Sequence, residues 1–358
     1  MKILLLGEFS GFHSTLKSGV TDLGYDITLA STGDAWKKFD RDISILPDFK
    51  YKSIEKFFRY FLPCINLKQL YGYDIVQFVN PAILSVINPF NAVMGRQIAK
   101  YSGKTFLSAC GDDFFYLEGL KKLRYGPLED AKRIDYKGHK MPVEYWWTQA
   151  WNIELASMVN GIIPVMFDYA EAYRNHPNLN VRSTIPLPVN LQQLKYIGCS
   201  TNKTKKIRIF HGLNREGFKG TRYVREAFSI LEKRYSDCAE FIIEGHIPYN
   251  SYISYLSEFD IVVDQVNSYS CGMNGIIAMA LGKVVVGGGE PESIIEFGET
   301  KSPIINITPN VSDIVEKISS LIESREKIES LGNESRSFAE KHHDHIKISK
   351  KYITEWLS

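Results

Sequence analysis

A chain of 358 residues with a formal net charge of +2 can bury the cores of two domains, and its charge balance excludes a large, uniformly basic surface for nucleic acid. Hydrophobic residues make up 44% of the chain and charged residues 23%, which is typical of a globular protein. The five cysteines are scattered and lack CxxC spacing, which favours a reducing compartment over a disulfide scaffold. Because no run of 18 apolar residues occurs and the first apolar run is too short for a signal segment, we expect a cytoplasmic protein.

The amino-terminal elements alternate between strand and helix. Residues 1–7 and 25–31 are predicted to form strands, and the helix between them is predicted to begin close to Gly11 and His13. This loop lacks the G-x-G-x-x-G spacing of dinucleotide-binding folds, so the sequence gives little support to a nicotinamide cofactor site here. His13 has two interpretations that stay open, a ligand contact or a polar residue at a helix start.

Residues 49–68 form a basic segment with aromatic side chains at helical spacing. Five cations against one glutamate give a local charge of 5 − 1 = +4. A basic helix with an aromatic face can lie at a membrane surface and contact a lipid-linked acceptor. It can equally be a surface helix that packs its aromatic face on its own core, which is the commoner case. Peripheral membrane contact through 49–68 therefore stays a hypothesis.

A pair of acids closes one of the next strands. Strands are predicted at 73–81 and 104–115, and the second ends in Asp112 and Asp113. In open α/β sheets, ligands bind at the carboxyl ends of strands. A carboxylate there can bind an acceptor hydroxyl or accept its proton. The alternative is that these acids cap the following helix.

The rest of the first half is less informative. Residues 118–145 are polar with little periodicity, and we expect a long irregular segment of the kind that often forms a lid. A tryptophan-containing helix, a strand at 161–167 with Asp168 capping a short helix, and a strand at 184–190 are predicted next. A polar, basic linker is expected around 188–205.

Two cations follow the first strand of the second half. A β-branched run at 207–210 leads to Arg215 and Lys219, and then to a helix with apolar residues at positions 224, 227, 228 and 231. Free N–H groups where a strand passes into a helix favour anions. Arginine offers a planar fork to phosphate oxygens and lysine a point charge. The pattern predicts a phosphate or diphosphate site.

The pattern is repeated further along the chain. Residues 260–265 predict a buried parallel strand, and the loop at 268–274 is rich in hydroxyl and amide groups that can bind ribose or phosphate. A short helix and a strand ending in three glycines follow. The strand at 240–245 leads to His246 and Ile247, whose backbone can contact a nucleotide base.

Residues 207–292 resemble the donor half of GT-B glycosyltransferases, especially the retaining family 4 type. The resemblance rests on AMALGKVV (278–285) and GGEPE (288–292), and on the Arg and Lys-Gly after the first donor-domain strand. Tyr269 and Ile277 stand where that family has the two glutamates of Glu-x7-Glu. The second glutamate holds the ribose in the family and isoleucine cannot, so either Asn274 or Glu292 replaces it or the donor binds differently.

The resemblance implies an α/β fold with two Rossmann-like domains whose parallel sheets face each other across a cleft. It implies an acceptor-binding domain at 1–190, a nucleotide-sugar domain at 191–340, and a final helix at 341–358 that crosses back to the first domain. The implied activity is transfer of a sugar, UDP-linked, to a hydroxyl acceptor with retention of anomeric configuration. A glycan or lipid-linked oligosaccharide in bacterial polysaccharide synthesis is the expected acceptor.

The candidate site residues follow from these patterns and from the resemblance. The expected catalytic residues are Asp112, Asp113, Arg215 and Lys219. The expected donor-binding residues are Gly11, His13, His246, Ile247, Ser270, Gly272, Met273, Asn274 and Glu292. We expect no cofactor and no metal, because the histidines at 342, 343 and 345 lack a matching Cys or carboxylate set and are predicted to lie on an exposed helix.

Two other functions fit the same architecture, because folds do not fix function. One is a nucleotide-sugar epimerase, which needs no acceptor. The other is a non-catalytic sugar-nucleotide or glycan-binding protein that has lost its acids.

Overall fold

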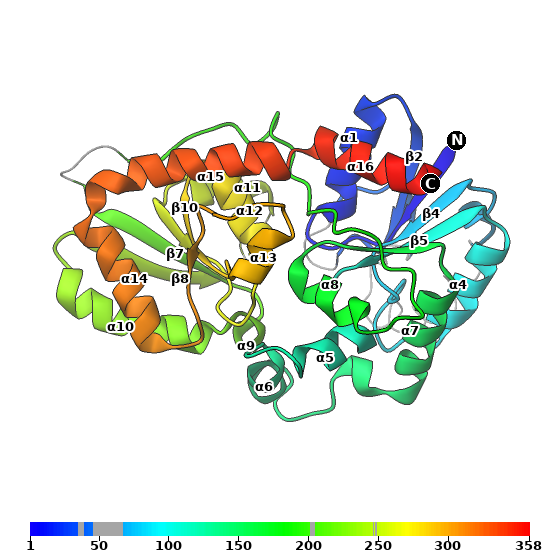
Figure 1. The fold of residues 1–358 in the computed structure, drawn as a ribbon, viewed down its shortest axis with the longest axis horizontal. Helices are drawn as coiled ribbons and strands as arrows, with labels where there is room; N and C mark the ends of the chain where they lie inside the picture. Colours follow the sequence, from blue (N-terminus) through cyan, green and yellow to red (C-terminus); the bar gives the residue numbers. More distant parts are fainter. Residues whose placement is uncertain (35–38, 46–66, 201–204, 246, 248) are drawn as a thin grey trace, which may run out of the picture. The chain divides into compact units, whose positions relative to one another are not determined.

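The chain folds into two compact units (Figure 1). The computed structural model describes residues 1–34, 39–45, 67–200, 205–245, 247 and 249–358. Unit 1 consists of Met1–Gly119, Lys140–Pro188 and His345–Ser358, and unit 2 consists of Leu120–His139 and Val189–Asp344. The segment Leu120–His139, here called the strap, thus lies inside the range 1–190 expected for the first domain but belongs to unit 2.

Unit 1 is built on a parallel sheet of six strands in the order β3-β2-β1-β4-β5-β6. The strands are β1 (Lys2–Leu6), β2 (Asp26–Ser31), β3 (Ile43–Ser44), β4 (Ile75–Phe78), β5 (Lys104–Ala109) and β6 (Gly161–Pro164). Every residue of β4 is buried, as expected for a parallel strand covered on both faces. The order reverses between β1 and β4, which is where open α/β sheets bind ligands.

Helices cover both faces of the unit 1 sheet (Figure 1). They are α1 (Phe12–Asp22), α4 (Phe90–Lys100), α5 (Phe114–Leu120), α7 (Trp146–Met158), α8 (Phe167–Arg174) and α16 (His345–Leu357), with short turns η2 (Leu67–Leu70) and η4 (Pro142–Glu144). Helix α16 packs on α1, and Trp356 Nε1 donates to Gln77 Oε1 of β4 at 2.9 Å. Helix α4 packs on α7 at Gly95, where a Cβ would lie 2.2 Å from the Trp151 ring.

Unit 2 is built on a parallel sheet of five strands in the order β11-β10-β9-β7-β8. The strands are β7 (Ile207–Leu213), β8 (Ala239–Gly245), β9 (Ile261–Val263), β10 (Val284–Gly287) and β11 (Ile305–Asn306). Successive strands are added on one side of β7 and then on the other, so the topological switch point lies between β7 and β9.

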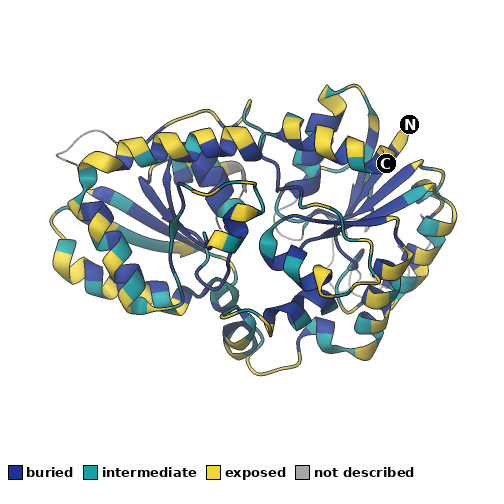
Figure 2. Cartoon of the chain, in the orientation of Figure 1, coloured by how far each residue is buried: buried dark blue, intermediate teal, exposed yellow. Residues whose placement is uncertain are grey.

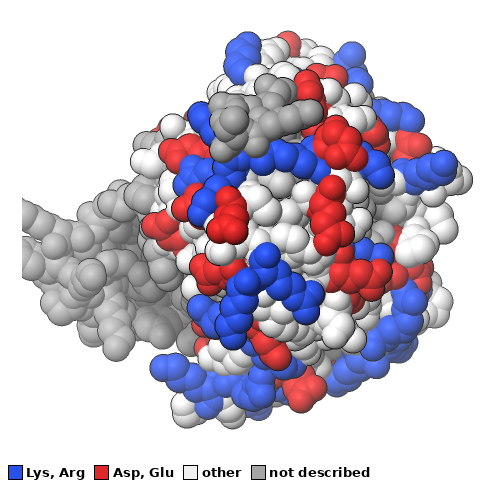
Figure 3. Space-filling model, turned by 90° about the vertical axis from the view of Figure 1, so that its left-hand side faces the viewer, with Lys and Arg blue, Asp and Glu red and all other residues white. Residues whose placement is uncertain are grey.

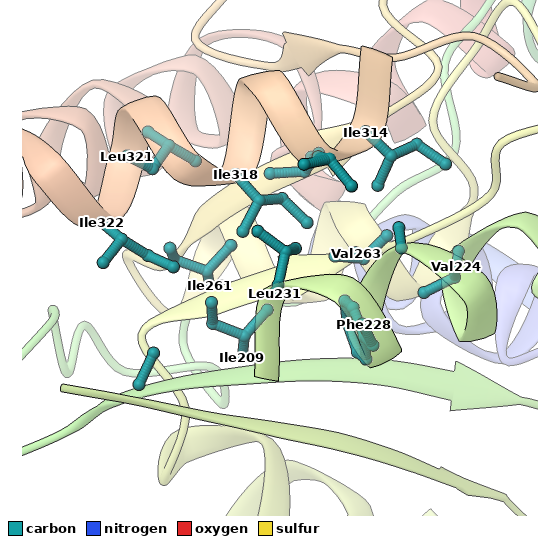
Figure 4. Packing of buried hydrophobic residues seen from close by; sticks show 14 of the residues in the cluster. Ile209, Val224, Phe228, Leu231, Ile261, Val263, Ile314, Ile318, Leu321 and Ile322 are labelled. Atoms are coloured by element: carbon teal, nitrogen blue, oxygen red, sulfur yellow. The ribbon is translucent and has the colours of Figure 1, made fainter. Parts of the chain in front are cut away.

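The helices of unit 2 also lie on both faces of its sheet. They are α6 (Leu128–Asp130), α9 (Glu216–Lys219), α10 (Thr221–Tyr235), α11 (Tyr249–Ser257), α12 (Met273–Ala280), α13 (Pro291–Ile295), α14 (Val311–Glu323) and α15 (Ile328–His342), with a short π-helix η3 (Ala131–Asp135) and a short 3₁₀ helix η5 (Arg325–Lys327). Helices α10 and α14 pack together on one face (Figure 4). Phe210 of β7 stacks on Phe259, which precedes β9, with ring centroids 4.8 Å apart.

Figure 4 shows the core that this arrangement buries. Phe228 and Leu231 of α10 and Ile318 of α14 point toward Ile209 and Ile261 of the sheet. The apolar residues of α10 in this core recur at the helical spacing that the sequence predicts. Burying one such side chain stabilises a fold by roughly 1.5–3 kcal/mol. Figure 2 shows the same division across the chain, with buried strands and helices exposed on their outer faces.

Some elements differ from those predicted. Helix α11 lies between the strands predicted at 240–245 and 260–265, where the residue pattern predicts no helix. Residues 184–190 form no strand, and the pairing described within that range is the isolated bridge Val189↔Asp344. Asp168 does not cap α8, since it lies inside the helix and Met166 precedes it.

The prediction of an exposed histidine segment is wrong. His342, His343 and His345 are all buried, with at most 8% of their surface exposed. The ring of Phe297 packs against His342 and His343 with centroids 5.3 and 5.5 Å apart, and His345 lies at the start of α16, which packs on α1. Apolar packing of imidazole rings is not visible in the residue pattern.

Three predictions from the sequence concern the basic segment 49–68, His246 and metal binding. Residues 49–66 of the basic segment and His246 lie outside the described residues. In the described part of the chain, no helix combines the length and apolarity that crossing a bilayer requires. Among the same residues, no three or more His, Cys, Asp or Glu side chains gather as metal ligands would. The face in Figure 3 carries cations and anions interspersed.

Candidate functional site

Arg215 and Lys219 lie at the switch point of unit 2. Both belong to the loop between β7 and α10, and the short helix α9 connects them. Lys219 Nζ donates to the Gly212 carbonyl at 3.0 Å and lies 3.7 Å from Asp264 Oδ1, at the end of β9. The Arg215 guanidinium carbon lies 3.8 Å from the centre of the Phe218 ring. The structure therefore places both predicted cations in the loop that follows β7, with Lys219 beside the carboxyl end of β9.

A neutral histidine supports this loop. His211 is fully buried in β7, with Nδ1 2.9 Å from the Val263 carbonyl and Nε2 2.9 Å from Thr221 Oγ1. Burial, helped by the nearby charge of Lys219, lowers the pKa of His211 to about 3. The imidazole is thus uncharged at neutral pH, and it joins β7 to β9 and α10 through hydrogen bonds.

The start of α12 is held by a buried carboxylate. Asp264 is 1% exposed, and its Oδ2 accepts a hydrogen bond from the Gly272 backbone N–H at 2.6 Å. Gln265 Nε2 donates to the Ser270 carbonyl at 2.9 Å. These bonds fix the loop 268–274 beside Lys219, so the two halves of the predicted donor site meet in unit 2.

This loop carries buried polar atoms. Ser270 Oγ and both amide atoms of Asn274 are buried and make no hydrogen bond with any residue that the structure describes. Asn274 Nδ2 lies 3.5 Å from the point where a Cβ on Gly212 would stand, so the amide faces the end of β7. A buried polar group without a partner is costly. Hydroxyl or phosphate oxygens of a ligand would satisfy these atoms, and Met273 lies between them in sequence at the start of α12.

The two positions where the family pattern has glutamate are both buried. Tyr269 is 3% exposed and Ile277 5%. The Tyr269 hydroxyl accepts hydrogen bonds from the Arg124 backbone N–H and from Arg124 Nε, both at 3.0 Å. Arg124 belongs to the strap, which the sequence presents as an irregular segment.

The same arginine engages the expected donor residue Glu292. Arg124 Nη2 lies 3.1 Å from Glu292 Oε1 and 2.7 Å from Glu290 Oε2. Burial would raise the pKa of Glu290, but hydrogen bonds from Asn306 and Tyr125 and the charge of Arg124 outweigh it and lower that pKa. Both carboxylates therefore have a cation beside them.

The strap also contacts the loop that carries the two cations. Asp135 accepts hydrogen bonds from the backbone N–H groups of Gly217 at 2.9 Å and Phe218 at 2.8 Å. Asp130 accepts from Arg222 Nε at 2.8 Å. Sequence reasoning missed these residues, because contacts between positions more than 80 apart leave no periodic signal.

In unit 1, Gly11 and His13 lie at the carboxyl end of β1. Gly11 precedes α1 with φ +83°, a left-handed conformation that favours glycine. His13 is fully buried, its Nδ1 donates to the Gly7 carbonyl at 2.8 Å, and its Nε2 has no hydrogen-bond partner in the described part of the chain. Burial lowers the pKa of His13 to about 3, so the neutral ring can accept a hydrogen bond at Nε2 but carries no positive charge.

Glu8 was not predicted as a site residue. It is 4% exposed, its Oε2 accepts from the Ser14 N–H at 2.7 Å, and its Oε1 is buried with no hydrogen-bond partner among the residues described. Burial raises the pKa of Glu8 to about 7 despite that hydrogen bond. A lone glutamate after a strand gives no indication in the sequence that it will be buried.

The acid pair at the end of β5 divides into two environments. Asp113 is fully buried, its Oδ1 accepts from the Tyr116 N–H at 2.8 Å, and its Oδ2 accepts from the Tyr173 hydroxyl at 2.7 Å. It therefore caps α5, and burial raises its pKa to about 7. Asp112 is half-buried. Cys110 precedes this pair and is buried, and burial raises the pKa of its thiol, which stays protonated.

The last expected donor contact lies after β8. Ile247 is half-buried and follows the carboxyl end of that strand, at the edge of the unit 2 sheet. Its backbone therefore lies at the same end of the sheet as Arg215 and Lys219.

Comparisons with known proteins give similarity of fold only. No protein-family model and no curated protein matches the chain. Sucrose-phosphate synthase of Thermosynechococcus elongatus superposes with a TM-score of 0.64 at 12% identity, over 99% of this chain and 98% of that one. HepE of Anabaena with UDP-glucose gives 0.64 at 13% identity over 100% and 99%. TarM of S. aureus gives 0.56 at 14% identity over 83% and 58%.

These similarities establish the fold. Two parallel sheets with flanking helices match GT-B glycosyltransferase structures over the whole chain, so the predicted fold class is confirmed.

Proposed function

We propose that this protein is a glycosyltransferase that moves a sugar from a UDP-linked donor to a hydroxyl acceptor. The observation that carries the proposal is the arrangement at the β7/β9 switch point. There, Arg215 and Lys219 follow β7, and Lys219 lies beside Asp264, which holds a loop whose buried Ser270 and Asn274 atoms have no hydrogen-bond partner among the described residues. Two cations fit a diphosphate, and hydroxyl and amide groups fit a ribose or a sugar. The structures of HepE with UDP-glucose and TarM with UDP support a uridine nucleotide.

The cations have a defined role in the proposed reaction. The bond between the anomeric carbon and the β-phosphate oxygen breaks, and negative charge develops on the departing UDP. Preorganised cations stabilise that charge more in the transition state than in the ground state. Lys219, anchored to the Gly212 carbonyl, and Arg215, stacked on Phe218, are held before the donor arrives. We propose that they act without a metal.

The acceptor loses a proton as its oxygen bonds to the sugar. We propose that Asp112, which is half-buried after β5, binds or deprotonates that hydroxyl, while Asp113 caps α5. A glycan or lipid-linked oligosaccharide is the acceptor class we propose, with retention of configuration. The TarM structure with fondaparinux and α-GlcNAc-glycerol supports a glycan-like acceptor.

A second function is favoured by one observation. Tyr269 and Ile277 occupy the positions of the family's two glutamates, and neither offers a carboxylate. A sugar-nucleotide-binding protein without turnover would tolerate this change. It would bind the donor and release no UDP.

A nucleotide panel tests both functions. The melting temperature would be measured with UDP, GDP, CMP, ADP and NAD at about 100 times the dissociation constant, where binding adds roughly 2.7 kcal/mol. A rise of a few degrees with UDP is expected. A rise with NAD alone contradicts the proposal. UDP release from UDP-glucose in the presence of glycan acceptors then separates the transferase from the binding protein.

A further inference from the structure

We propose that Asp135 is a positioning residue that sets Arg215 and Lys219 in their phosphate-binding arrangement. The inference rests on the proposed function, since it concerns the same site. It assigns a role to the strap, which the sequence separates from the donor half by the rest of unit 1.

Asp135 caps the amino-terminal end of α9. In that helix, Glu216 is the first residue, and Gly217 and Phe218 are the second and third. The residue before a helix usually accepts hydrogen bonds from the second and third N–H groups through its own side chain. Here Asp135 accepts both of them, through Oδ1 at 2.9 Å and Oδ2 at 2.8 Å. The cap comes from 82 and 83 positions upstream.

The residue at the cap position of α9 is an arginine. Arg215 holds that position and makes no side-chain capping bond, and a guanidinium has no acceptor to offer. Ser, Thr, Asp or Asn would normally be required there. Because Asp135 supplies the cap, position 215 is released for an arginine that can face a phosphate.

The capped turn carries both cations. The Lys219 backbone N–H donates to the Arg215 carbonyl at 2.9 Å, and the Arg215 guanidinium stacks on Phe218, whose own N–H is bound to Asp135. A change in this turn would therefore move both side chains. Misplacement of a binding group by about 1 Å can cost a hundredfold in rate.

The strap is itself held by hydrogen bonds to other parts of unit 2. Asp130 accepts from Arg222 Nε at 2.8 and 2.9 Å and from Asn267 Nδ2 at 3.2 Å. Asn267 Nδ2 also lies 3.1 Å from the Gly217 carbonyl. The Asp130 carbonyl oxygen lies 2.3 Å from the point where a Cβ on Gly217 would stand, so the two backbones are in direct contact. Asp135 is thus held in place before any ligand binds.

The test measures UDP binding by calorimetry for wild type and Asp135→Ala. Glu129→Gln, an exposed acid in the same strap, is the matched control. Loss of the two bonds is expected to weaken UDP binding about tenfold, the scale of a lost helix cap, while the control stays within twofold. Hydrogen exchange at Gly217 and Phe218 should accelerate in the variant. If Asp135→Ala does not fold, Asp135→Asn, which retains one acceptor oxygen, replaces it with a smaller expected loss.

A double-mutant cycle separates positioning from general destabilisation. In the Arg215→Ala/Lys219→Ala background, Asp135→Ala should change residual UDP affinity by less than twofold, because its effect acts through those side chains. Equal losses in both backgrounds would overturn the inference, as would unchanged affinity in the single variant. If wild type binds none of the nucleotides, the proposed function fails, and this inference fails with it. Wild-type binding with an unaffected variant overturns only the inference.

Discussion

The hydroxyl of Tyr269 accepts two hydrogen bonds from Arg124, one from the backbone N–H and one from Nε, each at 3.0 Å. Tyr269 belongs to the loop before α12, and Arg124 belongs to the strap. The Arg124 guanidinium carbon also lies 5.2 Å from the centre of the Tyr269 ring. At a position where the resembled family has a carboxylate, this chain therefore has a phenol that joins the strap to the loop before α12 within unit 2.

Tyr269→Phe should destabilise the protein modestly. The substitution removes the acceptor of two donors, and a hydrogen bond of this kind contributes about 1 kcal/mol net. We expect a loss of roughly 1–2 kcal/mol, because Arg124 is 62% exposed and its side chain can turn to water. Urea unfolding measures this. Tyr101→Phe is the control, since Tyr101 is 48% exposed. Equal stability of the two variants would contradict the role of the hydroxyl.

Lys219→Ala should lower turnover by about 10²-fold, the scale found when an electrostatic group of an active site is removed. Lys219 is 14% exposed and anchored to the Gly212 carbonyl, so its charge is held at the switch point. Initial rates of UDP release would be compared with those of Lys233→Ala, an exposed lysine of α10. Unchanged kinetics in Lys219→Ala would remove this residue from the mechanism.

The sequence predicts the elements whose signal is local. Helix α10 and strand β7 are found because apolar residues recur at helical or strand spacing. Arg215 and Lys219 are found because cations follow a strand. Helix α11 is missed, because its serines and tyrosines suggest a turn-rich link although the chain there packs on the sheet through Tyr255 and Phe210.

Contacts over long sequence distances explain what the sequence does not predict. Nothing in residues 118–145 indicates that Asp135 meets Gly217, because a single carboxylate has no periodicity. The burial of Glu8 and His13 is likewise not visible in the sequence. It raises the pKa of Glu8 and lowers the pKa of His13 for one physical reason. An acid and a base both lose their charged form when water is removed.

Glu8 should make stability depend on pH. Its folded pKa of about 7 lies above the ordinary 4.5, so the folded state binds more protons than the unfolded state between these values. Stability therefore falls as pH rises through this range and levels off above it. The full effect is about 3 kcal/mol as an upper bound.

Glu8→Gln removes that contribution and keeps an oxygen for the Ser14 N–H. Between pH 5 and pH 8 the variant should gain up to about 3 kcal/mol relative to wild type, and the pH dependence that remains includes Asp113. Denaturant unfolding at both pH values measures this. Glu316→Gln, on the exposed side of α14, should show no such gain. A Glu8→Gln variant that follows wild type at every pH would contradict the burial of an ionisable carboxyl.

Gly217→Ala should weaken both the fold of unit 2 and nucleotide binding. The new Cβ would lie 2.3 Å from the Asp130 carbonyl oxygen and 2.7 Å from its carbon, and backbone atoms cannot yield as a flexible side chain can. Either the strap or the α9 turn must move, which breaks the bonds from Gly217 and Phe218 to Asp135. We expect a loss of about 1–3 kcal/mol, as for overpacked sites. Gly126→Ala is the matched control, because its Cβ would lie 3.1 Å from the end of the Leu120 side chain. Melting temperature and UDP affinity should both fall for Gly217→Ala and stay near wild type for Gly126→Ala; the reverse order would show that the strap does not constrain this turn.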